Sequence, residues 1–278
     1  MDLDMYQHPA TQENLAMLKS REVSVIEPES GPLASGLDGK GRMAEPEAIA
    51  DWLESWFAKR APLHGHHVLV TAGPTHEPID AVRFIGNRSS GKMGYALAEA
   101  FATAGAAVHL ITGPTQLTAP ANVHEIVEVQ TAQEMFNETM ARFEKIDIAV
   151  AAAAVADARP VDAADHKLHK DQLPGAISLE ATPDILAAMG AQKTPTQFIV
   201  GFALETDDGL RSAQSKLERK KADLIILNTT ADAGAGFGTD TNKITILEKS
   251  GKTHNFELKS KAEVAKDIVE TVLNTLQS

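Results

Sequence analysis

Apolar and polar positions alternate in blocks from His66 to the end of the chain. Short, nearly continuous apolar runs are separated by longer segments in which apolar residues recur at helical spacing. Such runs are typical of strands buried on both faces of a sheet, and the spaced segments are typical of helices that cover it. Strands are predicted at residues 68–71, 107–111, 123–129, 146–152, 198–203, 224–227 and 243–248, and helices at residues 90–104, 131–143, 183–189, 209–220 and 261–276.

This order of elements predicts an α/β protein. We expect a Rossmann-like fold of three layers, in which a mostly parallel sheet lies between two layers of helices. In such sheets ligands bind at the carboxyl ends of the strands. The residues that follow the predicted strands are therefore the first candidates for a functional site.

The first sixty residues lack this alternation. Residues 12–18 and 45–57 have apolar positions near helical spacing, and residues 23–26 make a short apolar run that predicts a strand. Residues 31–42 are rich in glycine and predict a loop. So few apolar positions do not make a core of their own. We therefore predict a short N-terminal appendage that ends near residue 60.

The longest interruption of the pattern lies between residues 72 and 90, where polar residues and glycines separate a strand from the next helix. Long connections in compact α/β units usually carry function. Residues 89–91 lie at the helix start, where unpaired N–H groups and the helix dipole favour an anion. Arg83 and Asn87 lie close by, whereas a serine cap alone is the simpler alternative. The segment predicts a site for a phosphate-bearing substrate.

Two common nucleotide-binding patterns are absent. GNRSSGKM at residues 86–93 has the glycines and the lysine of a phosphate-binding loop, but Met93 stands where a hydroxyl group would hold Mg²⁺. The glycines at 234, 236 and 238 lie in a late loop and not between a strand and a helix. These differences disfavour a phosphate-loop nucleoside triphosphatase (NTPase) and a nicotinamide oxidoreductase.

Three further segments carry candidate ligand groups. Residues 151–157 leave a strand through small side chains and end at Asp157, so that a base or a phosphate can lie against the backbone; a buried strand with a capping aspartate is the alternative. Residues 166–170 add cations that would meet an anion there, or form a solvated loop. Lys216 and Lys220 share one helix face, which suits an anion between them or an ordinary charged surface.

Composition narrows the classes of function without identifying one. The chain has 278 residues, 43% of them hydrophobic, and a net charge of −12, which disfavours nucleic acid as a partner. The absence of cysteine excludes disulfides, thiolate zinc sites and a cysteine nucleophile. No apolar run suggests a membrane span and the N-terminus is not signal-like, so we expect no membrane partner and a cytoplasmic location.

Several segments, in their order along the chain, resemble one known family. They are VTAGPTHEPIDAVRFIGNRSSGKMG, AAAAVADARP, HKLHK, ATPDI, VGFALET, KLERKKADLIILN and GFGTDTNK. Together they are similar to the phosphopantothenate–cysteine ligase (phosphopantothenoylcysteine synthetase) family of coenzyme A biosynthesis over residues 64–278. We accordingly assign residues 61–278 to a ligase domain.

Residues 1–60 resemble the C-terminal end of another family. MYQHPATQENL and EPESGPLASGLDGKGRMAEPE are similar to the end of the phosphopantothenoylcysteine decarboxylases, whose flavin domain precedes the ligase in bacterial bifunctional proteins. Asp2 replaces the asparagine of that family, Ser35 and Asp38 lie where its cysteine is found, and the flavin-binding region has no counterpart. The resemblance therefore implies a remnant of a multifunctional enzyme, without decarboxylation and without bound flavin.

The resemblance to the ligase implies a reaction. The carboxylate of 4'-phosphopantothenate attacks the α-phosphate of CTP with Mg²⁺ present, giving an acyl-cytidylate and pyrophosphate. The amine of L-cysteine then displaces CMP. CTP is implied over ATP because ligases joined to the decarboxylase use CTP, and a homodimer is implied in which the partner subunit completes each site.

The resemblance also assigns roles to residues. Asn87, Arg83 and Lys167 match catalytic positions, although the family usually has Lys-x-Lys-Lys where His169 interrupts this chain. The candidate nucleotide-binding residues are Gly73, Ser89, Ser90, Gly91, Ala151, Ala152, Ala153, Asp157, Lys167, Pro183, Asp184, Ile185, Phe202, Lys216 and Lys220. Asp157 and Asp184 are the candidate metal ligands. The rival hypothesis is a catalytically silent nucleotide-binding or scaffolding module, and a flavin oxidoreductase ranks third.

Overall fold

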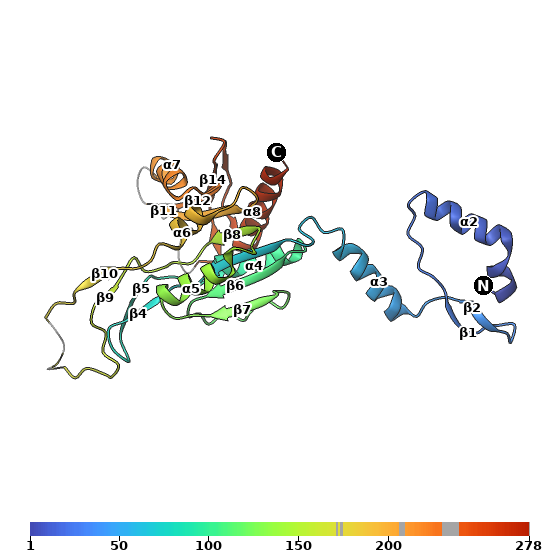
Figure 1. The fold of residues 1–278 in the computed structure, drawn as a ribbon, viewed down its shortest axis with the longest axis horizontal. Coiled ribbons are helices and arrows are strands. Elements are labelled where there is room, and N and C mark those ends of the chain that lie inside the picture. The colour runs from blue at the N-terminus through green and yellow to red at the C-terminus, as the bar shows by residue number, and fades with distance from the viewer. Residues whose placement is uncertain (171, 173–174, 206–208, 230–238, 278) are drawn as a thin grey trace. The chain divides into compact units, whose positions relative to one another are not determined.

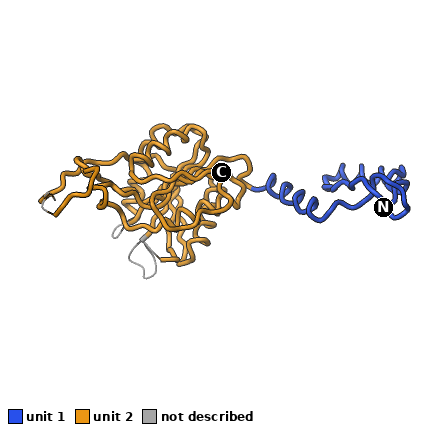
Figure 2. The backbone as a smooth tube through the Cα atoms, turned by 90° about the horizontal axis from the view of Figure 1, so that it is seen from below, with its two compact units in different colours: residues 1–61 blue, residues 62–278 orange. Residues whose placement is uncertain are grey.

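The computed structural model describes residues 1–170, 172, 175–205, 209–229 and 239–277. The chain divides into two compact units, Met1–Ala61 and Pro62–Ser278 (Figure 2). No helix in the described part of the chain combines the length and the apolar character needed to cross a bilayer.

The N-terminal unit contains three helices and one hairpin. The elements are α1 (Leu3–Gln7), α2 (Pro9–Ser20), β1 (Glu29–Pro32), β2 (Asp38–Arg42) and α3 (Pro46–Ala58). The helices expected at residues 12–18 and 45–57 are confirmed as parts of α2 and α3, and neither helix contains a fully buried residue.

Two predictions in this unit are wrong. Residues 23–26 form no strand, and the expected glycine-rich loop is the antiparallel hairpin of β1 and β2. The hairpin has almost no apolar alternation, so the strand pattern gave no signal. Its turn depends on Gly36 at φ 83°, a conformation that favours glycine. Val23 and its neighbours are apolar enough for a strand, but no strand pairs with them in the described structure.

The C-terminal unit is built on an eight-stranded sheet (Figure 1). Its order is β15 (Thr253–Asn255), β14 (Ile244–Glu248), β12 (Leu224–Thr229), β11 (Phe198–Glu205), β8 (Ile148–Ala151), β3 (His67–Ala72), β6 (Ala107–Thr112) and β7 (Glu125–Glu128). The six strands from β12 to β7 are parallel, and β14 and β15 continue the sheet antiparallel. The predicted α/β fold with a mostly parallel sheet is confirmed.

Helices cover both faces of this sheet. On one face, α4 (Lys92–Thr103) and α8 (Lys261–Leu276) pack on side chains such as Val68 and Val70. On the other, α5 (Ala132–Phe143), α6 (Ile185–Gln192) and α7 (Gly209–Lys220) pack on side chains such as Leu69 and Ile199. Because successive residues of a strand point to opposite faces, strands covered on both sides must be apolar throughout. This explains the continuous apolar runs.

Paired arms extend from the carboxyl ends of the parallel strands. The polar segment between residues 72 and 90 was expected to be a loop. That prediction is wrong in part, because the segment contains the hairpin of β4 (His76–Pro78) and β5 (Phe84–Gly86). A second arm pairs β9 (Ala158–Pro160) with β10 (Leu179–Ala181), and β4 contacts β9 (Figure 1). β13 (Thr241–Asn242) pairs with β16 (Lys259–Ser260) just before α8.

Candidate functional site

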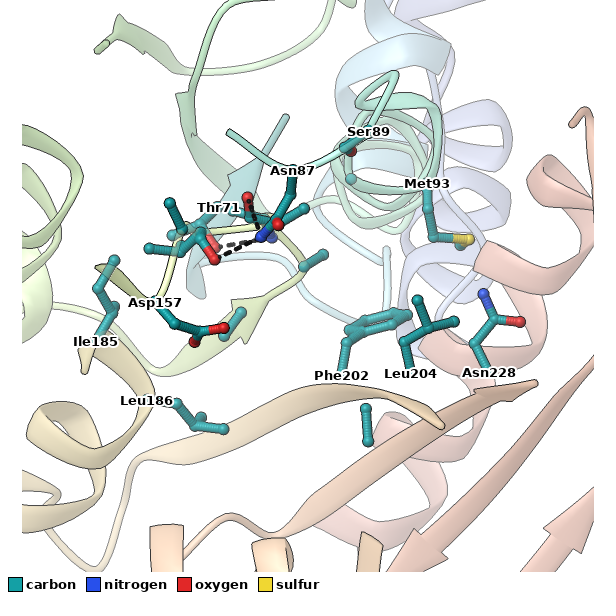
Figure 3. Close-up of a pocket in the computed structure, with 18 of the residues that line it drawn as sticks. Thr71, Asn87, Ser89, Met93, Asp157, Ile185, Leu186, Phe202, Leu204 and Asn228 are labelled. Carbon is teal, nitrogen blue, oxygen red and sulfur yellow. Dashed lines mark hydrogen bonds between the residues drawn. The ribbon is translucent and has the colours of Figure 1, made fainter. Parts of the chain in front are cut away.

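A cavity of about 840 Å³ lies at the carboxyl ends of the central strands. Its walls come from the segment before α4, the residues after β8, the starts of α6 and α8, and parts of β11, β12 and α7 (Figure 3). Topology predicts this place, because the loops that follow parallel strands meet at one edge of the sheet.

The electrostatics of the cavity suit an anion. Six basic side chains and two carboxylates line it, although the whole chain is acidic. The basic residues are Arg88, Lys92, Lys216, Arg219, Lys220 and Lys261, and the acidic residues are Asp157 and Asp184. Cations gathered in a cleft raise the local concentration of anionic ligands. The arrangement therefore favours a ligand with several negative charges.

The small-residue segment after β8 is held by two buried threonines. The Thr71 hydroxyl accepts from the Ala153 N–H at 3.3 Å, and the Thr75 hydroxyl accepts from the Ala156 N–H at 2.9 Å. The predicted residues 151–153 line the cavity as expected. Their methyl side chains leave backbone accessible to a flat ligand.

Asn87 connects this segment to the one before α4. Its Nδ2 donates to the carbonyl oxygen of Val155 at 2.8 Å and to that of Ala154 at 3.4 Å (Figure 3). The side chain is thus fixed at the middle of the cavity wall. The Asn87 amide can donate the same hydrogen bond to an oxygen of a bound acyl group in place of a backbone carbonyl oxygen.

The start of α4 opens into the cavity without a side-chain cap. Gly91 is the N-cap at φ 77°, and the Ser89 hydroxyl accepts from the Gly91 N–H at 3.3 Å. The alternative of an ordinary serine-capped helix is therefore wrong. The first N–H groups of α4 have no partner within the helix and are available to an anion.

Gly94 allows α4 to approach β3 closely. A Cβ atom there would lie 2.5 Å from the Ala72 Cβ atom. We predict that Gly94→Ala lowers the free energy of unfolding by about 1–3 kcal/mol, because the helix must move away from the strand. Thermal denaturation measures this change. Gly175→Ala, where nothing lies within 4 Å, is the matched control, and equal stability of the two variants would contradict the prediction.

The two α7 lysines occupy one wall. Lys216 Nζ donates to the Phe202 carbonyl oxygen at 2.7 Å, and Lys220 forms an ion pair with Asp184. Asp184 also caps α6 by accepting from the Ala187 N–H at 2.9 Å. Burial disfavours the charged form of Asp184, but these hydrogen bonds and the nearby lysines lower its pKa below the usual value. The Asp184 carboxylate thus holds the Lys220 ammonium group in place at the cavity.

Three predicted residues do not line the cavity. Gly73 lies next to the lining residue Gly91, and Arg83 and Lys167 belong to the arms. Arg83 forms an ion pair with buried Asp80 at 2.7 Å and donates to the Leu168 carbonyl oxygen at 2.6 Å. Burial opposes ionisation of Asp80, but N–H groups of Arg83, Val82 and Leu168 lower its pKa to about 2. This contact fastens one arm to the other.

The other predicted residues meet at the cavity. They are Asn87, Ser89, Ser90, Gly91, Ala151, Ala152, Ala153, Asp157, Pro183, Asp184, Ile185, Phe202, Lys216 and Lys220. Sequence reasoning missed several lining residues from the last third of the chain, such as Asn228, Asn242 and Lys261. Their only local signal is a position at the end of a strand or the start of a helix, which many residues share.

The two candidate metal ligands do not form a complete metal site. In the described parts of the chain, no three His, Asp or Glu side chains are grouped to hold a metal ion. Asp184 already binds Lys220 and the α6 N-terminus, while the Asp157 carboxylate faces the cavity (Figure 3). Mg²⁺ commonly binds one carboxylate together with substrate phosphates. Asp157 fits that arrangement.

Comparisons with known proteins cover both units. Residues 63–276 match the family model "DNA/pantothenate metabolism flavoprotein C-terminal domain", and residues 1–58 match the model "Flavoprotein". A relative from an unknown prokaryotic organism, called cysteine/cysteine sulfinic acid decarboxylase, is 50% identical over 277 residues, which are 98% of this chain and 77% of the relative. The coenzyme A biosynthesis bifunctional protein CoaBC of Bacillus subtilis is 44% identical over 98% of this chain and 67% of its own length.

A solved structure shares the fold. The crystal structure of the C-terminal domain of coenzyme A biosynthesis bifunctional protein CoaBC has a TM-score of 0.67 and 38% identity. It covers 78% of this chain and 98% of that domain. The similarity extends over most of the described C-terminal unit.

Proposed function

The chain belongs to the DNA/pantothenate metabolism flavoprotein C-terminal domain family, and from this premise we propose that it is the ligase of coenzyme A biosynthesis that joins 4'-phosphopantothenate to L-cysteine. The relatives named for coenzyme A biosynthesis support the pathway. The observation that carries the proposal is the cavity, in which an uncapped helix N-terminus and six cations face the small-residue segment held by Asn87.

The proposed reaction has two steps. A carboxylate oxygen of phosphopantothenate bonds to the α-phosphorus of CTP, and the electron pair of the broken phosphorus–oxygen bond leaves on pyrophosphate. The amine of L-cysteine then bonds to the acyl carbon, loses a proton, and CMP leaves with the electron pair of the acyl–oxygen bond. Phosphoryl transfer of this kind depends mainly on position and charge, which the cavity offers.

In this proposal, residues from each wall of the cavity have a defined role in the reaction. Lys216 and Lys220 bind phosphate groups of the nucleotide, and the α4 N-terminus contributes N–H groups. Asn87 donates to the acyl carbonyl as it becomes tetrahedral. Asp157 is the carboxylate available to a magnesium ion held by the phosphates, and a bound Mg²⁺ would supply positive charge at the α-phosphate.

We also propose a homodimer in which the arms of one subunit complete the site of its partner. Arg83 and Lys167 lie on the arms and outside their own chain's cavity. The arms carry exposed apolar side chains, which favour a protein contact. These are Val82, Phe84, Val161, Ile177 and Leu179, all between 41% and 61% exposed.

For the N-terminal unit we propose that residues 1–60 correspond to the end of a decarboxylase domain and residues 61–278 to the ligase domain. The match of residues 1–58 to the flavoprotein model supports this. Asp2, Ser35 and Asp38 stand where that family has other residues, so we expect no flavin and no decarboxylation. A flavin absorption band in the purified chain, or release of CO₂ from phosphopantothenoylcysteine, would contradict this part.

The cofactor and substrate requirements test the function. Pyrophosphate release should require both phosphopantothenate and CTP, and CMP release should require L-cysteine in addition. ATP should replace CTP poorly. Binding of CTP without turnover would instead support the alternative of a silent nucleotide-binding module.

A further inference from the structure

A buried carboxylate lies where the two arms meet. The first arm is the hairpin of β4 and β5, and the second pairs β9 with β10 beside it (Figure 1). Asp80 lies in the turn between β4 and β5 and is only 3% exposed. A buried carboxylate is costly unless hydrogen bonds and an opposite charge compensate it. The partners of Asp80 therefore indicate what its charge does.

The two carboxylate oxygens of Asp80 have different partners. Oδ1 accepts from the N–H groups of Val82 at 2.8 Å and Arg83 at 2.7 Å, within the turn. Oδ2 accepts from the Leu168 N–H of the second arm at 3.2 Å and pairs with the Arg83 guanidinium at 2.7 Å. Burial opposes ionisation, but these N–H groups and Arg83 lower the pKa of Asp80 to about 2. One oxygen thus closes the turn, and the other joins the arms.

The Asp80 carboxylate also fixes the orientation of a cation. Arg83 Nη2 contacts Asp80 and donates to the Leu168 carbonyl oxygen at 2.6 Å. A guanidinium group has five N–H donors, and among the described residues those on Nε and Nη1 of Arg83 have no protein acceptor. The Arg83 side chain is 35% exposed. Arg83 is therefore held by one nitrogen while its other donors remain available to an anion.

The same contacts place Lys167. This lysine directly precedes Leu168, whose N–H and carbonyl oxygen are both bound to side chains of the first arm. The Ala164 N–H donates to the Ile79 carbonyl oxygen at 3.0 Å, which adds a backbone contact between the arms. Residues 161–170 belong to no helix or strand, so their position depends on such contacts. The backbone on which Lys167 lies is thus held by the turn of the first arm.

We propose that Asp80 is a positioning residue of the ligase reaction, and that its carboxylate holds Arg83 and, through Leu168, the adjacent Lys167 as one unit for the partner subunit's site. This inference rests on the proposed ligase function and homodimer. Neither cation lines the cavity of its own chain, so the arms must bring both to the other cavity. Catalysis by fixed charges depends on position, and a shift of about 1 Å can cost about 10²-fold in rate.

The test separates the two oxygens of Asp80. Asp80→Asn keeps one oxygen for the turn, but its amide nitrogen cannot accept from Leu168 or pair with Arg83. Measured well below the melting temperature of each variant, formation of the cysteine adduct should fall by about 10²-fold. Asp162→Asn changes an exposed acid on the second arm and should keep the wild-type rate. A wild-type rate in Asp80→Asn would overturn the proposal.

A double-variant comparison distinguishes positioning from a general loss of stability. If Asp80 acts through Arg83, part of its effect is already lost in Arg83→Ala. The loss of activity in Asp80→Asn combined with Arg83→Ala should then be at least about 10-fold smaller than the product of the two single losses. Losses that multiply in full would show that Asp80 acts independently of Arg83, and the assignment would be wrong.

Hydrogen exchange tests the contact between the arms without substrates. In the ligand-free full chain, the Leu168 amide should exchange at least about 10-fold faster in Asp80→Asn than in the wild type, because it loses its acceptor. Asp162→Asn should leave this exchange rate unchanged. An unchanged rate in Asp80→Asn would also overturn the proposal. If Asp80→Asn does not fold, Asp80→Ser, whose hydroxyl can still close the turn, gives the same comparisons.

The outcomes distinguish this proposal from the proposed function. If Asp80→Asn behaves as wild type, the assignment of Asp80 is overturned while the ligase function stands. A wild-type chain that makes no product would overturn the ligase function and, with it, the positioning role. Hydrogen exchange needs no turnover, so it would still decide whether Asp80 holds the arms together.

Discussion

Asn87→Ala is expected to reduce formation of the cysteine adduct by about 10²–10³-fold while pyrophosphate release continues. The reason is that the Asn87 amide stands at the segment after β8, where its Nδ2 lies 2.8 Å from the Val155 carbonyl oxygen. In the second step this donor is available to the acyl oxygen as negative charge develops there. The first step depends on the cations instead.

The measurement follows both products in parallel. Pyrophosphate is assayed without cysteine in a single turnover, and the cysteine adduct is assayed with all three substrates. Asn137→Ala, an exposed asparagine on α5, is the control and should behave as wild type. Equal loss of both steps in Asn87→Ala would show that the residue supports the cavity wall and not the second step in particular.

Two inactive variants are expected to restore each other when their subunits are mixed. Lys216→Met removes a cation from the cavity, and Arg83→Ala removes one from an arm, so each should lose at least about 10²-fold in activity. If arms complete the partner's site, a mixed dimer has one site with both residues intact. Random mixing makes about half of the dimers mixed, so activity should return to about a quarter of the wild type.

The contacts of Arg83 make this experiment decisive. Within its own chain, Arg83 binds Asp80 and the Leu168 carbonyl oxygen and does not line the cavity. If Arg83 acts only within its own chain, by holding the two arms together, mixed samples should stay inactive whether or not the subunits form dimers. A control mixture of Lys216→Met with Lys220→Met should also stay inactive, because both residues belong to the same cavity wall.

The sequence was sufficient for the helices that cover the sheet and for seven of its eight strands, all except the edge strand β15. Strands such as β3 and β11 are buried on both faces, and the resulting apolar runs are hard to confuse with anything else. The hairpins β1–β2 and β4–β5 were missed because they lie outside this core. Their pairing depends on turns and on contacts with distant segments, which periodicity does not record.

The candidate site was predictable only where it follows strand ends. Asn87, Asp157 and Lys216 were accessible to reasoning because they lie beside predicted element ends or share a helix face. Lys261 and Asn242 reach the same cavity from the end of the chain, through the packing of α8 on α4. Side chains brought together by tertiary packing alone leave no local pattern. Arg83, which the resemblance places at a catalytic position, does not line the cavity of its own chain.

The acyl-cytidylate is the central claim, and an isotope label tests it most directly. Phosphopantothenate labelled with ¹⁸O in its carboxylate is incubated with CTP, L-cysteine and the full chain, and the CMP is analysed by mass spectrometry. Attack of the carboxylate on the α-phosphorus predicts CMP that carries one ¹⁸O atom. CMP without label, or adduct formed with release of CDP and phosphate, would contradict the account.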